Sequence, residues 1–251
     1  MHNFFVCESA RKENRFFIGG SDFNHIKNVL RMVKGDNFLV SCNGESHLCQ
    51  LEGFIGDSAV AEIIEENYQN TELPIKIYLF QGLPKSDKME LIIQKTVELG
   101  VAKIIPCEME RCVVKLEEKK KKSKRERWQA IAESAAKQSK RNTVPEICEV
   151  MSFKKALEMA KELDLLLVPY ENARGMIATK EALLKIKSGS SIGIFIGPEG
   201  GFEESEISAT NIAGGETVSL GERILRTETA AITAVGMCML YAEINLNGDK
   251  Q

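Results

Sequence analysis

Two glycine-rich turns contain the residues whose types and spacing suggest chemistry. The first, GPEGGF (197–202), follows the apolar run IGIFI, and the second, SLGERILR (219–226), places Gly221 directly after the short strand-like run TVSL (217–220). Pro198 removes a backbone donor and ends the preceding strand. Gly200 and Gly201 permit backbone angles and a close approach that a side chain would block. The two turns therefore predict a cleft in which backbone groups meet a ligand.

The first turn does not match the loops that bind phosphate. It contains neither G-x-G-x-x-G nor G-x-x-x-x-G-K-[ST]. The next helix begins with Glu203, Glu204 and Glu206, which suit the positive end of a helix but would repel a phosphate. We therefore expect a ligand without phosphates. An adenosine that carries a sulfonium would fit, because backbone groups can bind the adenine and carboxylates tolerate the cation.

The second turn contributes two cations, Arg223 and Arg226, beside a helix that should be buried. Charged groups in such a place need partners or a substrate. A purely structural interpretation pairs them with nearby acidic residues, namely Glu199, Glu222 and Glu228. A functional interpretation directs them toward a substrate, and the residue pattern leaves both open.

From about residue 73 the pattern predicts an α/β domain. Strand-like runs IKIYLFQG, AKIIPC, LDLLLVPY and SIGIFIG alternate with helical patterns, as expected for a buried parallel sheet. The last helix, AAITAVGMCMLYAEI, is nearly all apolar and has Thr227 or Thr229 as a possible cap. It must pack against the sheet or against a second subunit.

Residues 1–72 predict a small β-barrel, so the two domains would be 1–72 and 73–251. Short extended patterns such as RFFIG, DNFLVSC and AVAEII are separated by Gly, Asn and Asp turns. One helix is expected within SDFNHIKNVLRMVKGD, with Ser21 or Asp22 as its cap and Gly35 at its end. Its apolar face would consist of Phe23, Ile26, Val29, Leu30 and Val33.

Composition and cysteine usage limit the classes of protein. The chain has 251 residues, of which 43% are hydrophobic and 27% charged, as in ordinary globular proteins. It contains no apolar run of the roughly 18 residues that a membrane helix needs and no signal-peptide core, so a cytoplasmic protein is expected. Seven scattered cysteines predict reduced thiols. The histidines, all near the N-terminus, exclude a histidine base or zinc site in the later part of the chain, and we expect no metal.

Charge is distributed unevenly along the chain. Between residues 111 and 141, twelve Lys or Arg face four Glu, a local charge of +8, whereas the whole chain carries −3 and the remainder therefore −11. Such asymmetry is typical of a surface that binds a polyanion. The run EEKKKKSKRER by itself favours a solvated helix over a binding surface.

Six collinear segments resemble those of a known family. They are HIKNVLRMVKGD, GLPKSDKMELIIQKTVELGV, ERCVVK, AAKQSKRNTVPEI, GPEGGFEESEI and SLGERILRTETAA. Together they resemble the SPOUT RNA methyltransferases, and within them the ribosomal RNA small subunit methyltransferase E family, over most of the chain. The resemblance implies a PUA-like barrel, a trefoil-knotted α/β methyltransferase domain and a homodimer. It also implies S-adenosylmethionine as cofactor and methylation of a uridine N3 in 16S rRNA.

The resemblance also implies a set of site residues. Arg226 would be the catalytic residue that stabilises charge on the uracil oxygens. Glu199 or Glu228 could accept the proton, but either could equally be a helix cap, so the general base is not assigned. The cofactor would contact Val168, Pro169, Ile196, Gly197, Pro198, Glu199, Gly200, Gly201, Ser219, Leu220, Gly221, Ile224, Leu225, Arg226 and Thr229. The RNA would contact Arg31, Arg111, Lys137, Lys140, Arg141 and Asn142.

One departure concerns the N-terminus. Relatives often carry an arginine just before the first aromatic strand, where this chain reads MHNFF, so an RNA contact there is in question. Arg11, Arg15 or Arg31 could substitute. Trp128 and Phe202 would either stack a base or belong to the core. Neither the target uridine nor the form of the substrate, free 16S rRNA or an assembled small subunit, follows from the sequence.

Two other functional classes compete with a methyltransferase. An RNA-binding module without catalysis would explain a barrel and a basic stretch, but not two glycine turns around a cleft. A nucleotide-dependent α/β enzyme would explain the turns, but the acidic start of the following helix disfavours phosphate binding.

Overall fold

The computed structural model describes residues 1–173 and 175–246. The chain forms two compact units, and we describe each by itself. The first comprises Met1–Glu72 with Ala136–Val144, and the second comprises Leu73–Ala135 with the described residues from Pro145 onward. The sequence placed the boundary near residue 72 but assigned 136–144 to the second domain, whereas these residues pack with the first.

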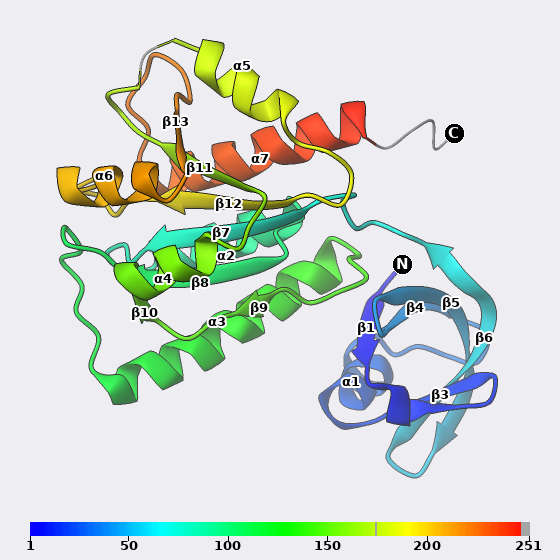
Figure 1. The fold of residues 1–251 in the computed structure, drawn as a ribbon. Coiled ribbons are helices and arrows are strands. Elements are labelled where there is room, and N and C mark those ends of the chain that lie inside the picture. Colours follow the sequence, from blue (N-terminus) through cyan, green and yellow to red (C-terminus); the bar gives the residue numbers. More distant parts are fainter. Residues whose placement is uncertain (174, 247–251) are drawn as a thin grey trace. The chain divides into compact units, whose positions relative to one another are not determined.

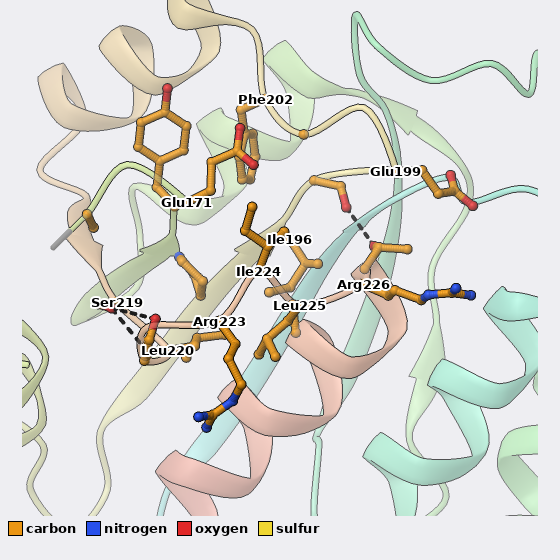
Figure 2. A pocket seen from close by; sticks show the side chains of 18 of the residues that line it. Glu171, Ile196, Glu199, Phe202, Ser219, Leu220, Arg223, Ile224, Leu225 and Arg226 are labelled. Carbon is orange, nitrogen blue, oxygen red and sulfur yellow. Dashed lines mark hydrogen bonds between the residues drawn. The ribbon is translucent and has the colours of Figure 1, made fainter. Parts of the chain in front are cut away.

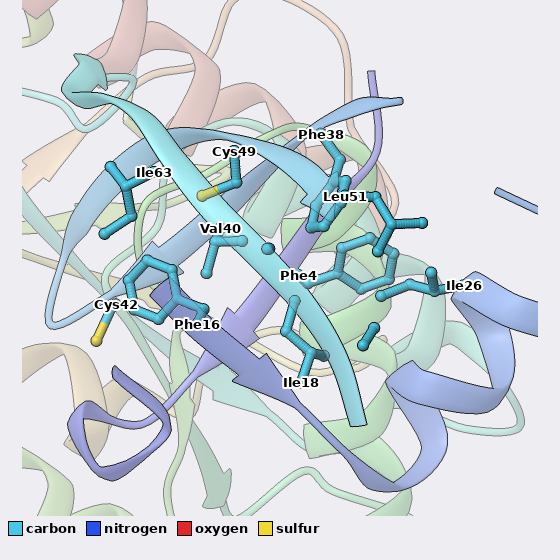
Figure 3. Packing of buried hydrophobic residues seen from close by; sticks show 12 residues of the cluster. Phe4, Phe16, Ile18, Ile26, Phe38, Val40, Cys42, Cys49, Leu51 and Ile63 are labelled. Atoms are coloured by element: carbon cyan, nitrogen blue, oxygen red, sulfur yellow. The ribbon is translucent and has the colours of Figure 1, made fainter. Parts of the chain in front are cut away.

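The first unit is built on a curled six-stranded sheet whose strand order is β1-β4-β5-β6-β3-β2. Strands β1 and β4 are parallel, and the other neighbours are antiparallel. Its concave face encloses a cluster of buried apolar side chains that includes Phe4, Phe16, Phe38 and Leu51 (Figure 3). The strands are β1 (Asn3–Val6), β2 (Arg11–Lys12), β3 (Arg15–Ile18), β4 (Asn37–Cys42), β5 (Glu45–Ile55) and β6 (Ser58–Gln69), with a short 3-10 helix, Glu8–Ala10.

The helix predicted between β3 and β4 is shorter and less regular than expected. It consists of α1 (Gly20–Asn24) and a π-helical turn, η2 (His25–Val29). Ile26 is fully buried, but Val29 and Val33 are exposed. Phe23 and Leu30 are partly buried against the same core, so the expected apolar face is confirmed at these positions and at Ile26. It does not include Val29 and Val33, because the wider π turn and the end of the helix before Val33 break the 3.6-residue period.

The second unit is an α/β fold with a parallel sheet, as predicted. The strand order is β10-β8-β7-β12-β11-β13, with β9 also paired to β8, and every pairing is parallel. Buried apolar side chains dominate the central strands, as a sheet covered on both faces requires. The strands are β7 (Lys76–Gly82), β8 (Lys103–Glu108), β9 (Glu146–Ile147), β10 (Met151–Ser152), β11 (Leu165–Pro169), β12 (Ser191–Ile196) and β13 (Glu216–Val218).

Helices flank this sheet (Figure 1). Helix α7 packs on β7 and β12 and beside α2. Its buried face is made of small residues such as Ala231, Ala234 and Ala242, whereas Leu240 and Ile244 on the same helix are exposed. The helices are α2 (Lys88–Glu98), α3 (Glu118–Gln138), α4 (Phe153–Ala160), α5 (Ile177–Leu184), α6 (Glu204–Ile212) and α7 (Thr227–Asn245).

The topology brings both glycine turns to one edge of the sheet. Strand β12 ends at Ile196, directly before the first turn, and β13 ends at Val218, directly before the second. Carboxyl ends of parallel strands meet at the same edge, where open α/β sheets bind their ligands. Among the described residues, no helix has the length and apolar character needed to cross a membrane.

Candidate functional site

A pocket of about 420 Å³ lies between the two glycine turns at the carboxyl edge of the second unit's sheet. Its size is within the range of small-molecule sites. Figure 2 shows Ile196 and Leu225 beside it, with Glu199 and Arg226 together on one side and Arg223 extending to another. The pocket therefore combines an apolar interior with a charged rim.

The first glycine turn is held rigidly from several sides. A Cβ at Gly82, at the end of β7, would lie 2.7 Å from the Pro198 ring, so glycine is needed for the turn to approach the strand. Gly201 has φ +70° and donates its N–H to the carbonyl oxygen of Pro198 at 2.9 Å. Arg111 contributes a further anchor, because it pairs with Glu203 at 2.6 Å and donates to the carbonyl oxygen of Gly200 at 3.1 Å.

The acidic residues after this turn form a helix cap. The side chain of Glu203 accepts from the backbone at the third position of α6, and Glu206 Oε2 accepts from the backbone N–H of Glu203 at 2.9 Å. Glu206 also accepts from the N–H of Glu110 at 3.0 Å. Carboxylates thus occupy two of the donors at this helix end, which agrees with a ligand that carries no phosphate.

The second turn is fixed by a buried threonine of α5. Thr179 Oγ1 donates to the carbonyl oxygen of Ser219 at 2.9 Å and accepts from the Ser219 N–H at 3.0 Å. Gly221 follows with φ +108°, a conformation that favours glycine. Its N–H donates to Ser219 Oγ at 3.2 Å, which closes the turn.

Thr227 connects the two turns. Its hydroxyl donates to the carbonyl oxygen of Gly197 at 2.6 Å and accepts from the amide of Gln81 at 3.0 Å. Both Thr227 and Gln81 are buried. Hydrogen bonds among buried groups are costly to lose, so the start of α7 is fixed against the end of β12.

Lys88 and two glutamates form the charged rim. The Lys88 ammonium lies 3.0 Å from Glu199 Oε1 and 3.5 Å from Glu228 Oε2, and the backbone N–H of Lys85 donates to Glu199 Oε1 at 3.0 Å. Burial of the Glu199 carboxylate raises its pKa, but hydrogen bonds from Lys88 and from backbone N–H groups outweigh this effect and leave the pKa lowered. Glu199 therefore stays ionised at neutral pH. The hydrogen bond to Glu199 raises the pKa of Lys88.

The two arginines of the second turn are not held in this network. Arg223 and Arg226 are exposed, and neither guanidinium group makes a hydrogen bond or ion pair with another residue in the described part of the chain. The purely structural interpretation of these arginines therefore does not hold in the described structure, because Lys88 occupies two of the carboxylates that would have paired with them. Arg226 borders the pocket with a free guanidinium.

Most of the residues expected to contact a cofactor line the pocket, and three do not. Those that line it are Pro169, Ile196, Gly197, Pro198, Glu199, Gly201, Ser219, Leu220, Gly221, Ile224, Leu225 and Arg226. Val168 is fully buried within β11, Gly200 faces Arg111, and Thr229 lies in the first turn of α7, next in sequence to the lining residue Ala230.

Other lining residues were not predicted, namely Lys88, Tyr170, Glu171, Ala173, Phe202, Glu222, Arg223, Thr227 and Ala230. Phe202, considered as either a stacking or a core residue, is buried and also lines the pocket. The adjacency of Tyr170 to Pro169 and of Thr227 to Arg226 was a signal that the sequence offered. Lys88 had no such signal, since it is far from both turns in sequence.

The residues expected to bind RNA occupy different environments. In the first unit, Arg141 and Asn142 are buried, and the guanidinium of Arg141 pairs with Glu72. Asn142 donates to the carbonyl oxygen of Gln69 at 3.0 Å, and its backbone N–H donates to Glu72 at 2.9 Å. These two residues therefore hold the 136–144 segment against the end of β6.

The remaining expected RNA contacts are more accessible. Lys137 pairs with Asp22 at 2.8 Å, and Arg111 pairs with Glu203 in the second unit. Lys140 and Arg31 are exposed, both with positive φ, and their side chains have no partner among the described residues. Trp128 is buried in the core. Within the described ranges, no group of three or more His, Cys, Asp or Glu side chains could hold a metal ion.

Comparison with known proteins identifies the family. Residues 71–239 match the family model described as an RNA methyltransferase domain, and residues 18–64 match an RNA methyltransferase PUA domain. Ribosomal RNA small subunit methyltransferase E from Bacillus subtilis (strain 168) is 43% identical over 239 residues, which cover 94% of this chain and 93% of that protein. The protein of the same name from Mesomycoplasma hyopneumoniae (strain 232) is 36% identical, covering 95% and 99%.

A solved structure agrees with these relatives. Ribosomal RNA small subunit methyltransferase E from Neisseria gonorrhoeae bound to S-adenosyl methionine has a TM-score of 0.81 and 31% identity, and the match covers 96% of this chain and 97% of that one. Sequence and fold agree along nearly the whole length, and the chain belongs to the ribosomal RNA small subunit methyltransferase E family of RNA methyltransferases.

Proposed function

We propose that this protein transfers a methyl group from S-adenosylmethionine to N3 of a uridine in 16S rRNA. The observation that carries the proposal is the pocket between two glycine turns, with Arg226 at its rim and no described residue paired with the Arg226 guanidinium. Family membership supports the RNA class of the substrate, and the relative from Neisseria gonorrhoeae was solved with this cofactor. We place the activity in the cytoplasm, where small ribosomal subunits are assembled.

The pocket suits the cofactor in both shape and polarity. Ile196, Leu220 and Leu225 provide apolar surface for an adenine ring, and the backbone groups of the two turns provide hydrogen bonds. The capping box of Glu203 and Glu206 occupies two N–H groups at the start of α6 and places two carboxylates there, which disfavours a phosphate. When bound, S-adenosylmethionine supplies a methyl group on a sulfonium centre.

We assign Arg226 the role of stabilising the transition state of methyl transfer. Transfer would form the bond between N3 and the methyl carbon as the bond from that carbon to the sulfonium breaks, with S-adenosylhomocysteine as the leaving group. The N3 proton would pass to solvent water, and its loss would place negative charge on the neighbouring carbonyl oxygens. A fixed guanidinium beside them can contribute about 3 kcal/mol of stabilisation. Arg226 can serve because no described residue occupies it, and because it precedes the buried start of α7, which fixes its backbone.

Glu199 is poorly suited to be the general base. Its carboxylate accepts hydrogen bonds from Lys88 and from the backbone N–H of Lys85, and its pKa is lowered. A base with a depressed pKa takes up a proton reluctantly at neutral pH. We therefore assign Glu199 to the structure of the rim.

RNA binding is assigned to exposed cations of both units. Lys140 and Arg31 in the first unit have side chains available for phosphates, and exposed lysines at the start of α3 add nonspecific attraction. Arg111 and Lys137 can contribute charge while they remain in their ion pairs. Arg141 and Asn142 act through the shape of the 136–144 segment.

The assembly we propose is a homodimer of chains with a trefoil-knotted second unit. Exposed apolar side chains on α7, Leu240 and Ile244, together with Ile224 beside the pocket, offer surface that a second subunit would cover. The knot is supported by the path from the edge strand β13 through the second turn to α7, which packs on β7 and β12.

Two measurements test the function. Calorimetry with S-adenosylmethionine, ATP and NAD should show binding of the first alone. Incubation with labelled donor should then transfer a methyl group to small ribosomal subunits or to free 16S rRNA, and primer extension should stop at a single uridine, because methylation at N3 blocks base pairing. Binding of ATP or NAD in preference, or a label on another base, would contradict the proposal.

A further inference from the structure

Lys88 occupies an unusual position for a lysine. It is the first residue of α2, where the helix dipole favours an acidic side chain and disfavours a cation. Its ammonium is placed there between Glu199, from the first glycine turn, and Glu228, from the first turn of α7, at 3.0 and 3.5 Å. A lysine at this helix end therefore depends on two carboxylates that belong to the two walls of the pocket.

Arg226 differs from Lys88 in its partners. It is separated from Glu228 by one residue, and it borders the same pocket as Glu199 (Figure 2). Guanidinium groups pair readily with carboxylates through two parallel hydrogen bonds. Yet Arg226 forms no ion pair with any described residue. The Lys88 ammonium lies within ion-pair distance of both carboxylates, hydrogen-bonded to Glu199 Oε1 and at 3.5 Å from Glu228 Oε2, a buried oxygen without a hydrogen-bond partner among the described residues.

We propose that Lys88 is a positioning residue that keeps the guanidinium of Arg226 free for the substrate. With Lys88 present, two positive charges, the Lys88 ammonium and the Arg226 guanidinium, balance the two carboxylates at the rim. Without it, two carboxylates face one guanidinium, and Arg226 is drawn into an ion pair. The inference rests on the proposed function, in which Arg226 acts on the uracil.

The variant Lys88→Met tests this directly, because methionine keeps much of the side-chain length and removes the charge. We expect kcat to fall roughly tenfold, the size of a typical coupling between neighbouring charges. In the background Glu199→Gln with Glu228→Gln, no carboxylate remains to capture Arg226, so adding Lys88→Met should cause no further loss. Lys95→Met is the matched control, since it removes a lysine from the same helix that pairs only locally, with Glu98.

A second readout does not depend on activity. Phenylglyoxal modifies free guanidinium groups, and peptide mass spectrometry can follow Arg226 in the full-length protein without cofactor. Its modification rate should fall several-fold in Lys88→Met and return in the triple variant. Arg223, exposed and without a partner among the described residues, provides an internal reference whose rate should stay constant.

The outcomes separate this inference from the proposed function. Lys88→Met could lower kcat equally in the natural protein and in the Glu199→Gln, Glu228→Gln background, or it could leave the modification rate of Arg226 unchanged. Either result would overturn the role of Lys88 and indicate that it contacts the RNA or only stabilises the fold. If Arg226→Ala retains normal kcat, the catalytic role of Arg226 fails. The modification rates alone then decide whether Lys88 keeps the guanidinium free.

Discussion

Thr227 donates a hydrogen bond of 2.6 Å to the carbonyl oxygen of Gly197 and thereby joins the start of α7 to the first glycine turn. Gln81 donates to the same hydroxyl from the end of β7. One buried hydroxyl thus connects three segments that are distant in sequence. This hydrogen bond fixes the positions of the pocket's two walls relative to each other.

Replacing Thr227 with valine should loosen the pocket. The change keeps the shape of the side chain but leaves a carbonyl oxygen and an amide without their partner, at a cost of about 1–3 kcal/mol of folding free energy. We expect a lower melting temperature and weaker binding of S-adenosylmethionine by calorimetry. Thr227→Ser retains the hydroxyl and should behave like the natural protein, and equal losses in both variants would argue against the hydrogen bond as the cause.

Lys140 and Arg141 should respond differently to alanine. Lys140 is exposed, so Lys140→Ala should leave stability unchanged and reduce the salt dependence of RNA binding by about one unit of slope. Arg141 is buried in its ion pair with Glu72, and removing one partner of such a pair costs about 3–5 kcal/mol. Thermal unfolding and binding titrations at several salt concentrations would distinguish the two. A stable Arg141→Ala protein with weakened RNA binding would show instead that Arg141 contacts the nucleic acid.

The fold and the pocket were largely predictable from local patterns. Alternating strand and helix signals predicted the parallel sheet, and the two glycine turns predicted a cleft; most residues of the two turns line the pocket. Short stretches of neighbouring residues determine these features. A pattern of apolar spacing fails only where the backbone departs from the regular period, as at Val29 and Val33.

The charge network was not predictable in the same way. Which of several acidic residues a cation meets depends on tertiary contacts, and the sequence offered Arg223 and Arg226 as partners for glutamates that Lys88 in fact holds. Likewise, Arg141 and Asn142 lie in a basic stretch that suggested RNA contact, but they are buried against the end of β6. Charge density along a sequence indicates where a polyanion could bind, but not which side chains face solvent.

Acid should weaken the rim of the pocket. The folded pKa of Glu199 is lowered, so its contribution to stability is present above the unfolded value of about 4.3 and is lost as pH falls through the folded pKa. The difference in unfolding free energy between the natural protein and Glu199→Gln should therefore shrink as urea titrations move from neutral pH toward strong acid. Lys88, whose pKa is raised, contributes fully below about 10.4 and loses its contribution only at higher pH. A difference that grows on acidification would contradict the assignment of Glu199 as a paired anion.

Arg226 provides the sharpest test of the mechanism, because two roles predict different kinetics. If its guanidinium stabilises charge on the uracil, Arg226→Ala should lower kcat roughly 10²-fold with little change in the Kd of S-adenosylmethionine. If it only grips the methyl donor, the Kd should rise and saturating donor should restore the rate. Arg226→Lys should rescue poorly in either case, since an ammonium cannot form a planar bidentate contact. We expect the first pattern, because the guanidinium has no described partner and its backbone is fixed by the buried start of α7. Single-turnover rates with saturating RNA, measured beside calorimetric Kd values, would separate the two roles, and normal values of both would assign Arg226 to neither.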